Sequence, residues 1–241
     1  IWMALPGPQL TAIDITDPDV PVAMPPVPVP RLPLRMALQS GRLALIGTGG
    51  LDVFDVSDPG EPALLGSLPG SGTGVVFGET TDIAYVVNSD GLLTVSLAVP
   101  GQPAVVDSWH QNATSQRDVE IVGDQLWLTS QSGAMALDLS DPDHPRGLGT
   151  WGPEWLVEGI DVEDDIAYIV AGRRLNLLDV SDPLHPTVVS TIDDVEIAQA
   201  EVYGDPPVAV IASQRALRTV DVSDPLHPVT LGNVWSPCDS P

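Results

Sequence analysis

One short phrase recurs along this chain at a nearly fixed spacing, and that spacing limits the fold more than any other feature. The phrase reads DITDP, DVSDP or DLSDP in five places, and a degenerate copy, SLAVPGQP, stands at 96–103. The first prolines of the six copies are at positions 18, 59, 100, 142, 183 and 225, so successive copies are 41 or 42 residues apart. Six units of one length predict a repeat fold in which each unit is one supersecondary structure.

Each unit reads as four short strands. In the unit 152–192, the runs GIDVE, IAYIV, RLNLLDVS and PTVVSTI are rich in β-branched or aromatic residues and are separated by Asp, Gly or Pro. Tyr85, Trp127 and Tyr168 each stand 15 residues before the first proline of their copy, so the second and third strands keep a constant length. Four antiparallel strands at this period are typical of a β-propeller blade. A β-solenoid is the competing repeat fold, but its coils are usually shorter.

We therefore expect an all-β protein with one β-propeller domain over residues 1–241, six-bladed, with a seventh blade upstream as the alternative count. The units run approximately over 1–31, 32–70, 71–110, 111–151, 152–192 and 193–235, followed by a tail at 236–241. The first unit has sequence for its last three strands only, so its innermost strand is expected to come from upstream sequence or from another chain.

A proline-rich run, PPVPVPRLP, follows the first unit at 25–33. We interpret it as the extended link into the second unit. The alternative is a polyproline II segment that docks into an aromatic groove of a partner.

The recurring phrase has its own turn chemistry. Asp and Ser at the end of a strand accept hydrogen bonds from the backbone N–H groups of the following turn, and Pro presets φ at the first corner. The third unit has Ser96 and Val99 in place of the two aspartates, so its turn should be held differently. Three histidines, His144, His185 and His227, share one turn position. We interpret them as structural, because equivalent turns of different blades lie too far apart to share one metal ion.

The units containing LLDVSDPLHP resemble the LVIVD repeat, a propeller-forming motif of bacterial and archaeal surface or secreted proteins. The resemblance covers about residues 2–235. It implies a propeller and an extracellular, cell-surface or periplasmic setting, and it implies no established reaction.

The charge balance narrows the classes of partner. Thirty-three acidic residues face nine basic ones, all of them Arg, which gives a formal net charge of −24. Such a field repels phosphate groups, so nucleic acid and anionic membrane surfaces are poor partners. The sequence also has no apolar run of the roughly 18 to 20 residues that a membrane-spanning helix requires.

Acidic residues of the predicted first strands are the candidate ligand-binding site. DVE occurs at 118–120 and again at 161–163, and another acid falls near the same place in the last unit. The candidates are Asp118, Glu120, Asp161, Glu163 and Glu201. First strands line the central channel of a propeller, so these acids are expected to hold cationic groups of a ligand. The alternative is that they accept hydrogen bonds from turns or backbone.

Three functions fit these observations. The favoured one is a binding or scaffold propeller that contacts protein partners, without catalysis and without a cofactor. The second is a hydrolase or lyase that uses the inner-strand carboxylates. The third is an adhesion module stabilised by calcium, whose preferred ligands are oxygen atoms.

Overall fold

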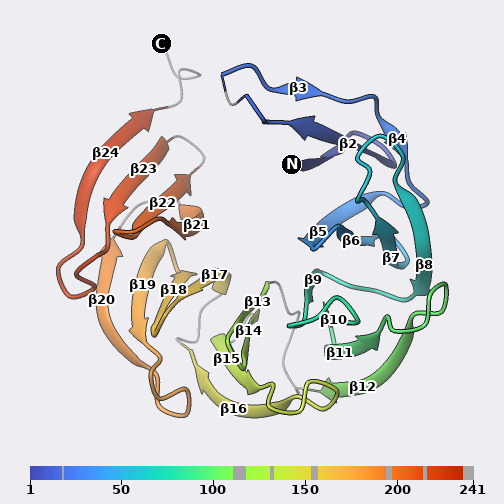
Figure 1. Ribbon diagram of the computed structural model, residues 1–241. Coiled ribbons are helices and arrows are strands. Elements are labelled where there is room, and N and C mark those ends of the chain that lie inside the picture. Colours follow the sequence, from blue (N-terminus) through green and yellow to red (C-terminus); the bar gives the residue numbers. More distant parts are fainter. Residues whose placement is uncertain are drawn as a thin grey trace. The chain divides into compact units, whose positions relative to one another are not determined.

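The computed structural model describes residues 1–17, 19–110, 118–130, 133–152, 157–193, 197–213 and 216–235 (Figure 1). The strands of these ranges form six antiparallel sheets of four strands each, the blades of a six-bladed β-propeller fold, as the sequence predicts. These ranges contain no helix that is long and apolar enough to cross a membrane. The predicted tail at 236–241 lies outside the described residues.

Two compact units divide the chain. The first comprises residues 1–110 and 142–144, and the second comprises residues 111–141 and 145–241. Each holds three of the six sheets.

The first unit begins with the sheet of β1 (Trp2–Leu5), β2 (Gln9–Asp14), β3 (Val22–Ala23) and β4 (Val27–Pro28). Its second sheet has β5 (Pro33–Gln39), β6 (Arg42–Gly47), β7 (Gly50–Asp55) and β8 (Ala63–Pro69). The third has β9 (Gly74–Phe77), β10 (Ile83–Asn88), β11 (Gly91–Ser96) and β12 (Ala104–His110). In the last two sheets each strand pairs with the next one in the chain.

The second unit repeats this order three times. Its sheets are β13 (Val119–Val122), β14 (Gln125–Ser130), β15 (Gly133–Asp138) and β16 (Arg146–Trp151); β17 (Val157–Glu163), β18 (Ile166–Ala171), β19 (Arg174–Asp179) and β20 (Thr187–Asp193); and β21 (Ile197–Tyr203), β22 (Val208–Ser213), β23 (Ala216–Asp221) and β24 (Val229–Trp235).

The first sheet differs from the other five. The strand before the phrase is β2, so β1 corresponds to the second strand of the other sheets. Both β3 and β4 pair with β2, and together they occupy the fourth-strand position in two short pieces. Among the described residues, β1 pairs with β2 and no strand pairs with its other edge.

The interpretation of the proline-rich run as a link is only partly right. Its residues Val27 and Pro28 form β4, and Val29 is buried beside Leu10. Pro25 and Pro26 separate β3 from β4, because proline has no N–H to donate to a strand ladder. The run therefore completes the first sheet before it leads into β5.

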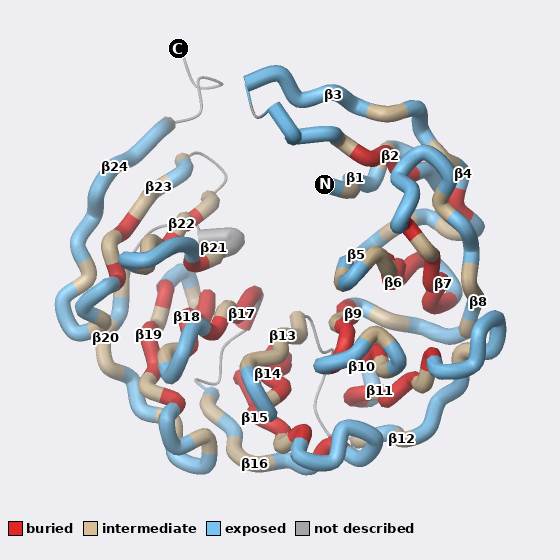
Figure 2. The backbone as a smooth tube through the Cα atoms, in the orientation of Figure 1, coloured by how far each residue is buried: buried red, intermediate tan, exposed pale blue. Residues whose placement is uncertain are grey.

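Burial follows the strand positions within each sheet. The aromatic residues Tyr85, Trp127 and Tyr168 are at most 2% exposed and lie on the second strands. Figure 2 shows buried residues gathered on the middle strands and exposed residues along the fourth strands, such as β20 and β24. Strand β19 has buried apolar residues on both of its faces, so its sheet must be covered on both sides. Stacked blades provide this cover.

The turns after the third strands have the predicted hydrogen bonds. Asp179 Oδ1 accepts the N–H of Ser181 at 3.0 Å and its hydroxyl at 2.6 Å. These bonds favour the ionised carboxylate, so the pKa of Asp179 lies below its usual range. The same backbone bond recurs at Asp14, Asp55, Asp138 and Asp221.

The second aspartate of the phrase closes the rest of the turn. Asp182 Oδ1 accepts the N–H of Leu184 at 3.0 Å, and its other oxygen bonds Nδ1 of His185 at 2.9 Å. His227 bonds Asp224 in the same way at 3.0 Å. These two histidines therefore belong to their own turns.

The third repeat holds its turn differently from the others, as predicted. Ser96 Oγ accepts the N–H of Ala98 at 3.5 Å, which is the outer limit of a hydrogen bond. No aspartate carboxylate is present in this copy to take its place.

Fourth strands pack against the turn of the following sheet. A Cβ added at Gly66 would lie 2.7 Å from Cδ of Pro103, and one at Gly149 would meet the backbone carbonyl of Pro183. Ser190, at the same repeat position, donates its hydroxyl to the carbonyl of Pro225 at 2.6 Å. In the five sheets after the first, the register of the fourth strand shifts just beside this position, which marks a β-bulge. The recurring turn thus also fixes the neighbouring sheet.

This contact predicts different effects for one substitution at two equivalent glycines. Gly66→Ala should lower the free energy of unfolding by about 1–3 kcal/mol, because the new methyl group overlaps the Pro103 ring. Gly232→Ala is the matched control, since its Cβ would meet only Thr219 Oγ1 at 3.6 Å, and it should stay within about 0.5 kcal/mol. Denaturant unfolding measures both, and equal effects would contradict the contact.

Candidate functional site

Three of the five predicted acids occupy one repeat position on successive first strands. Glu120 on β13 pairs with Trp127, and Asp161 on β17 pairs with Tyr168. Glu201 on β21 pairs with Val210. Trp127, Tyr168 and Val210 each stand 15 residues before the first proline of their copy, so the three acids are structurally equivalent. We call Glu120, Asp161 and Glu201 the acid row.

The two copies of DVE differ by two residues in their position on the strand, because the last residue of the first copy, Glu120, matches the first residue of the second copy, Asp161. The other two acids are therefore not part of the row. Asp118 precedes β13, and its Oδ1 accepts the N–H of Val119 at 3.1 Å. Glu163 is exposed and ends β17. The repeat position of Asp118 falls on Gly159 in the next sheet, where an added Cβ would lie 3.7 Å from Asp118 Oδ2.

Glu120 and Asp161 share a hydrogen bond between neighbouring sheets. Glu120 donates to the Asp161 carboxylate, and Glu120 also accepts a bond from the N–H of Val162. Burial and the neighbouring Asp161 charge raise the pKa of Glu120 to about 9. Burial also raises the pKa of Asp161, although its hydrogen bonds favour the ionised form. At neutral pH Glu120 therefore keeps its proton and donates it in the bond to Asp161.

Asp161 also bonds the last sheet of the second unit. Asp161 Oδ2 accepts the N–H of Val202 on β21. The carboxyl groups of Glu120 and Asp161 thus each bond a backbone N–H of the following first strand, at Val162 and Val202. These contacts join the three sheets of the second unit.

Tyr203 marks the exposed end of the acid row. Its hydroxyl donates to Glu201 Oε2, and this bond raises the pKa of Tyr203 to about 12. Residues two apart in a strand face the same side, so Glu201 and Tyr203 lie on one face of β21. Tyr203 is 56% exposed, whereas Tyr168 is buried. An exposed aromatic ring beside a carboxylate can contact a cationic side chain.

The first unit has apolar residues at the equivalent position. Ala37 pairs with Ala44, and Val76 pairs with Tyr85, which are the residues 15 positions before their prolines. The acid row is therefore a property of the second unit. Spacing from the phrase would have revealed the row; nothing in the sequence indicated Tyr203 or the bonds to Val162 and Val202.

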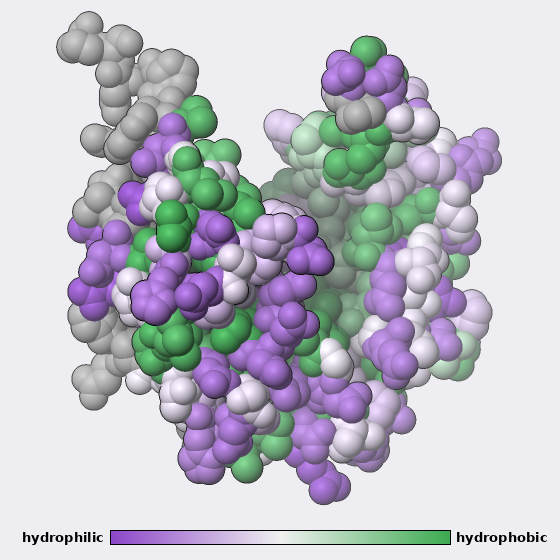
Figure 3. All heavy atoms as spheres, turned by 60° about the vertical axis from the view of Figure 1, so that its left-hand side comes forward, coloured by the Kyte–Doolittle hydropathy of each residue, from purple (hydrophilic) through white to green (hydrophobic). Residues whose placement is uncertain are grey.

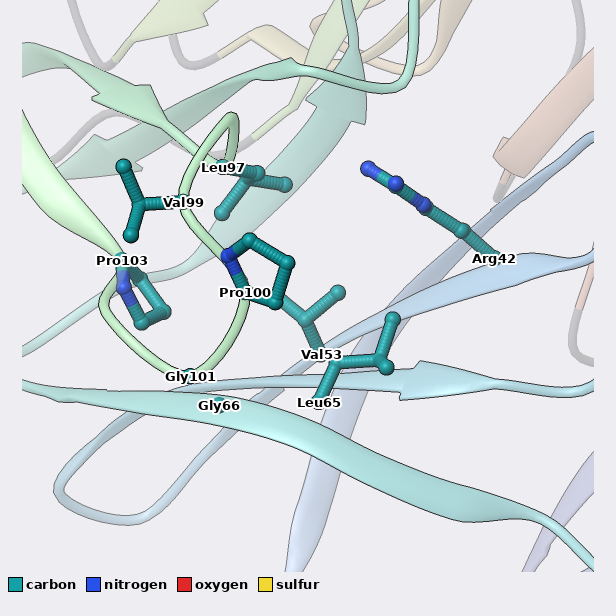
Figure 4. A pocket seen from close by; sticks show the side chains of 9 residues that line it. All are labelled: Arg42, Val53, Leu65, Gly66, Leu97, Val99, Pro100, Gly101 and Pro103. Atoms are coloured by element: carbon teal, nitrogen blue, oxygen red, sulfur yellow. The ribbon is translucent and has the colours of Figure 1, made fainter.

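The first unit has a small apolar pocket where the degenerate turn meets the second sheet. Leu97, Val99 and Pro100 line one side, and Val53 and Leu65 line the other, with Arg42 nearby (Figure 4). Its volume is about 50 Å³, enough for a small aliphatic group. Arg42 is already bonded to the carbonyl of Thr81 at 2.9 Å and to Asp82 at 3.1 Å.

No metal-binding group of three or more His, Cys, Asp or Glu side chains occurs in the described part of the chain. The acid row offers carboxylate oxygens as hydrogen-bond acceptors, and Glu120 offers a proton to Asp161.

Comparison with known families finds the LVIVD repeat in three segments, residues 40–69, 157–194 and 202–235. No curated protein matches the chain.

Several solved structures have a similar fold at low sequence identity. A protein from Lactobacillus plantarum has 11% identity and a TM-score of 0.76, over 94% of this chain and 77% of that one. A putative 6-phosphogluconolactonase from Bacteroides uniformis has 11% identity and a TM-score of 0.74, over 98% and 84%. PorZ of Porphyromonas gingivalis, a surface component of the type-IX secretion system, has 14% identity and a TM-score of 0.62, over 83% and 28%.

The raised pKa of Glu120 predicts how stability depends on pH. The pKa of Glu120 is higher in the folded protein than its ordinary value of 4.5, so the folded state binds the proton more tightly. This contribution is complete below pH 4.5 and is lost as pH rises toward 9. Glu120→Gln keeps a neutral hydrogen-bonding side chain, so its melting temperature should fall less between pH 5 and pH 9 than that of the wild type.

Glu163→Gln is the control for this measurement, since Glu163 is exposed and outside the row. Its melting temperature should follow the wild-type profile. Parallel profiles for Glu120→Gln and the wild type would show that Glu120 is ionised in the folded protein.

Proposed function

Because three segments of this chain are LVIVD repeats and its fold is a β-propeller, we propose that it is a binding propeller that contacts protein partners without catalysis. We place this activity outside the cytoplasm, in the periplasm, at the cell surface or in the extracellular medium. The family resemblance supports that setting. PorZ, a surface component with a similar fold, is consistent with it.

The bonding of the acid row is the observation that carries this proposal. Glu120 and Asp161 accept backbone N–H groups from the following sheets, so part of their hydrogen-bonding capacity is used to join blades. Glu201, which is partly exposed, accepts the hydroxyl of Tyr203 at the end of the row, and the Tyr203 side chain is 56% exposed. A carboxylate next to a tyrosine ring suits the recognition of a partner more than proton transfer. Recognition needs no base that faces a substrate.

A cationic side chain of the partner fits this end of the row. The formal net charge of −24 attracts basic partners and speeds their encounter. An Arg or Lys side chain would pair with Glu201 and stack on the Tyr203 ring. Of the other predicted acids, Asp118 and Glu163 add to the local negative potential, whereas Glu120 keeps its proton at neutral pH.

A hydrolase is the second candidate, and the Glu120–Asp161 pair is what favours it. Acid–base catalysis uses hydrogen-bonded carboxyl groups of which one keeps its proton at neutral pH, as Glu120 does beside Asp161. The fold likeness to a putative 6-phosphogluconolactonase suggests lactones as the first substrates to test. Lactone hydrolysis by the wild type that disappears in Glu120→Gln would favour this function over binding.

Titration with a labelled peptide of alternating Arg and Gly tests the binding function. The combined variant Glu201→Gln with Tyr203→Ala should weaken binding roughly tenfold, because it removes one ion pair and one ring contact. Fluorescence polarisation at two salt concentrations measures the affinity, which should fall at the higher one.

Glu79→Gln is the matched control, because Glu79 is an exposed acid of the first unit. If Glu79→Gln weakens peptide binding as much as the combined variant does, the peptide is attracted by the whole charged surface. The acid row would then not be the binding site.

A further inference from the structure

The third copy of the phrase, SLAVPGQP, departs from the other five, and the binding function above makes no use of it. Ser96 and Val99 stand where the other copies have aspartates. In the second copy, the equivalent Asp58 accepts the N–H of Gly60 at 2.9 Å. The Val99 side chain cannot accept such a bond, and it lines the apolar pocket between this turn and the second sheet. The departure from the phrase therefore supplies part of the pocket wall.

The size of the pocket limits what can enter it. Apolar side chains line it from both sides, such as Leu97 and Pro100 of the turn and Leu65 of the second sheet (Figure 4). Its volume of about 50 Å³ is about a third of the roughly 150 Å³ of an apolar cavity that holds benzene. The pocket therefore has room for about three carbon atoms, the size of an isopropyl group.

Arg42 gives the pocket a cation. Among the described residues that line the pocket, it alone is charged, and its side chain reaches from β6 toward Leu97 (Figure 4). Its Nη1 donates to the carbonyl of Thr81 and to Asp82, at 2.9 Å and 3.1 Å. Within the described ranges, its Nε and Nη2 make no hydrogen bond. These two groups form the pair of donors that binds a carboxylate with two parallel bonds.

The charge around this turn favours an anion more than the charge around the other turns does. Each of the five regular copies has two aspartates, and the third copy has none. Arg42 and Asp82 form an ion pair whose side chains are 31% and 59% exposed. An ion pair open to solvent contributes little to stability, so Arg42 can share its charge with a ligand.

Apolar surface elsewhere does not single out a site as clearly. On the face that Figure 3 presents, hydrophobic residues lie scattered among hydrophilic ones. The pocket beside the third turn differs from them because an apolar volume and a cation meet in one place.

We propose that this pocket binds a free, short, branched aliphatic carboxylate. The branched end enters the apolar volume, and the carboxylate pairs with Nε and Nη2 of Arg42. Pro100 and Pro103 have no N–H group to bond a peptide backbone, so a free acid fits the pocket better than the end of a peptide. The site shares no residue with the acid row or Tyr203, so either function can fail without the other.

Titration of the full chain with isovalerate, followed by ligand-observed NMR, measures the affinity. Isoamyl alcohol has the same branched end without the charge, and acetate has the charge without the branched end. Each should bind roughly tenfold more weakly than isovalerate. Acetate that binds as tightly as isovalerate would show that the apolar pocket is not used and would overturn the proposal. N-acetyl-leucine that binds more tightly would identify the end of a peptide as the occupant and would overturn a free acid.

Two substitutions restore the regular phrase, and only one of them changes the pocket. Val99→Asp restores the turn carboxylate and places a negative charge in the pocket wall, so it should weaken isovalerate roughly tenfold. Ser96→Asp is the matched control, because it adds the same charge at a residue that does not line the pocket. It should change the affinity less than about threefold. Both variants follow the sequence of the regular copies, so both should keep the wild-type melting temperature. An equal loss of affinity in the two variants would overturn the proposal.

Arg42→Gln tests the cation separately. It should lower the affinity for isovalerate to that for isoamyl alcohol and leave the affinity for the alcohol unchanged, which also shows that the pocket is intact. Isovalerate that binds Arg42→Gln as tightly as the wild type would show that Arg42 does not hold the carboxylate, and would overturn the proposal.

Discussion

The structure depends on a hydrogen bond between an aspartate carboxylate and a backbone N–H two residues later. In the turn after β19, Asp179 and Asp182 each make such a bond, and the turn that they shape fixes the path of the chain into β20. Turns of this kind also meet the fourth strand of the preceding sheet, as at Gly149 and Ser190. One short phrase thus sets both the hairpin within a sheet and the contact between sheets.

The period and the turn chemistry made most of the fold predictable. Strands β17 to β20 fall almost where the alternation of apolar residues and the Asp, Gly and Pro breaks place them. The proline-rich run was harder, because β4 has only two residues and its pairing with β2 depends on a contact that no local pattern signals. The β-bulges of the fourth strands were also invisible, since they change register without a residue type of their own.

The candidate site shows a different limit of sequence reasoning. The letters DVE suggested that Asp118 matches Asp161, but the strand register places Glu120 there. Counting back from the following proline gives the correct match, because the second and third strands keep their length and the segment before them does not. The raised pKa of Glu120 depends on burial and on a neighbour 41 residues away, so only the folded structure reveals it.

The packing of fourth strands against the next turn has a consequence for the order of folding during synthesis. Gly66 meets Pro103, and Ser190 meets Pro225, so each sheet is completed by residues that are translated later. A nascent sheet would emerge from the ribosome with the bulged part of its fourth strand still exposed. That surface would be covered only when the following hairpin is made. Folding would then proceed from the amino terminus with a lag of one repeat, and the most recently made sheet would always be the least protected.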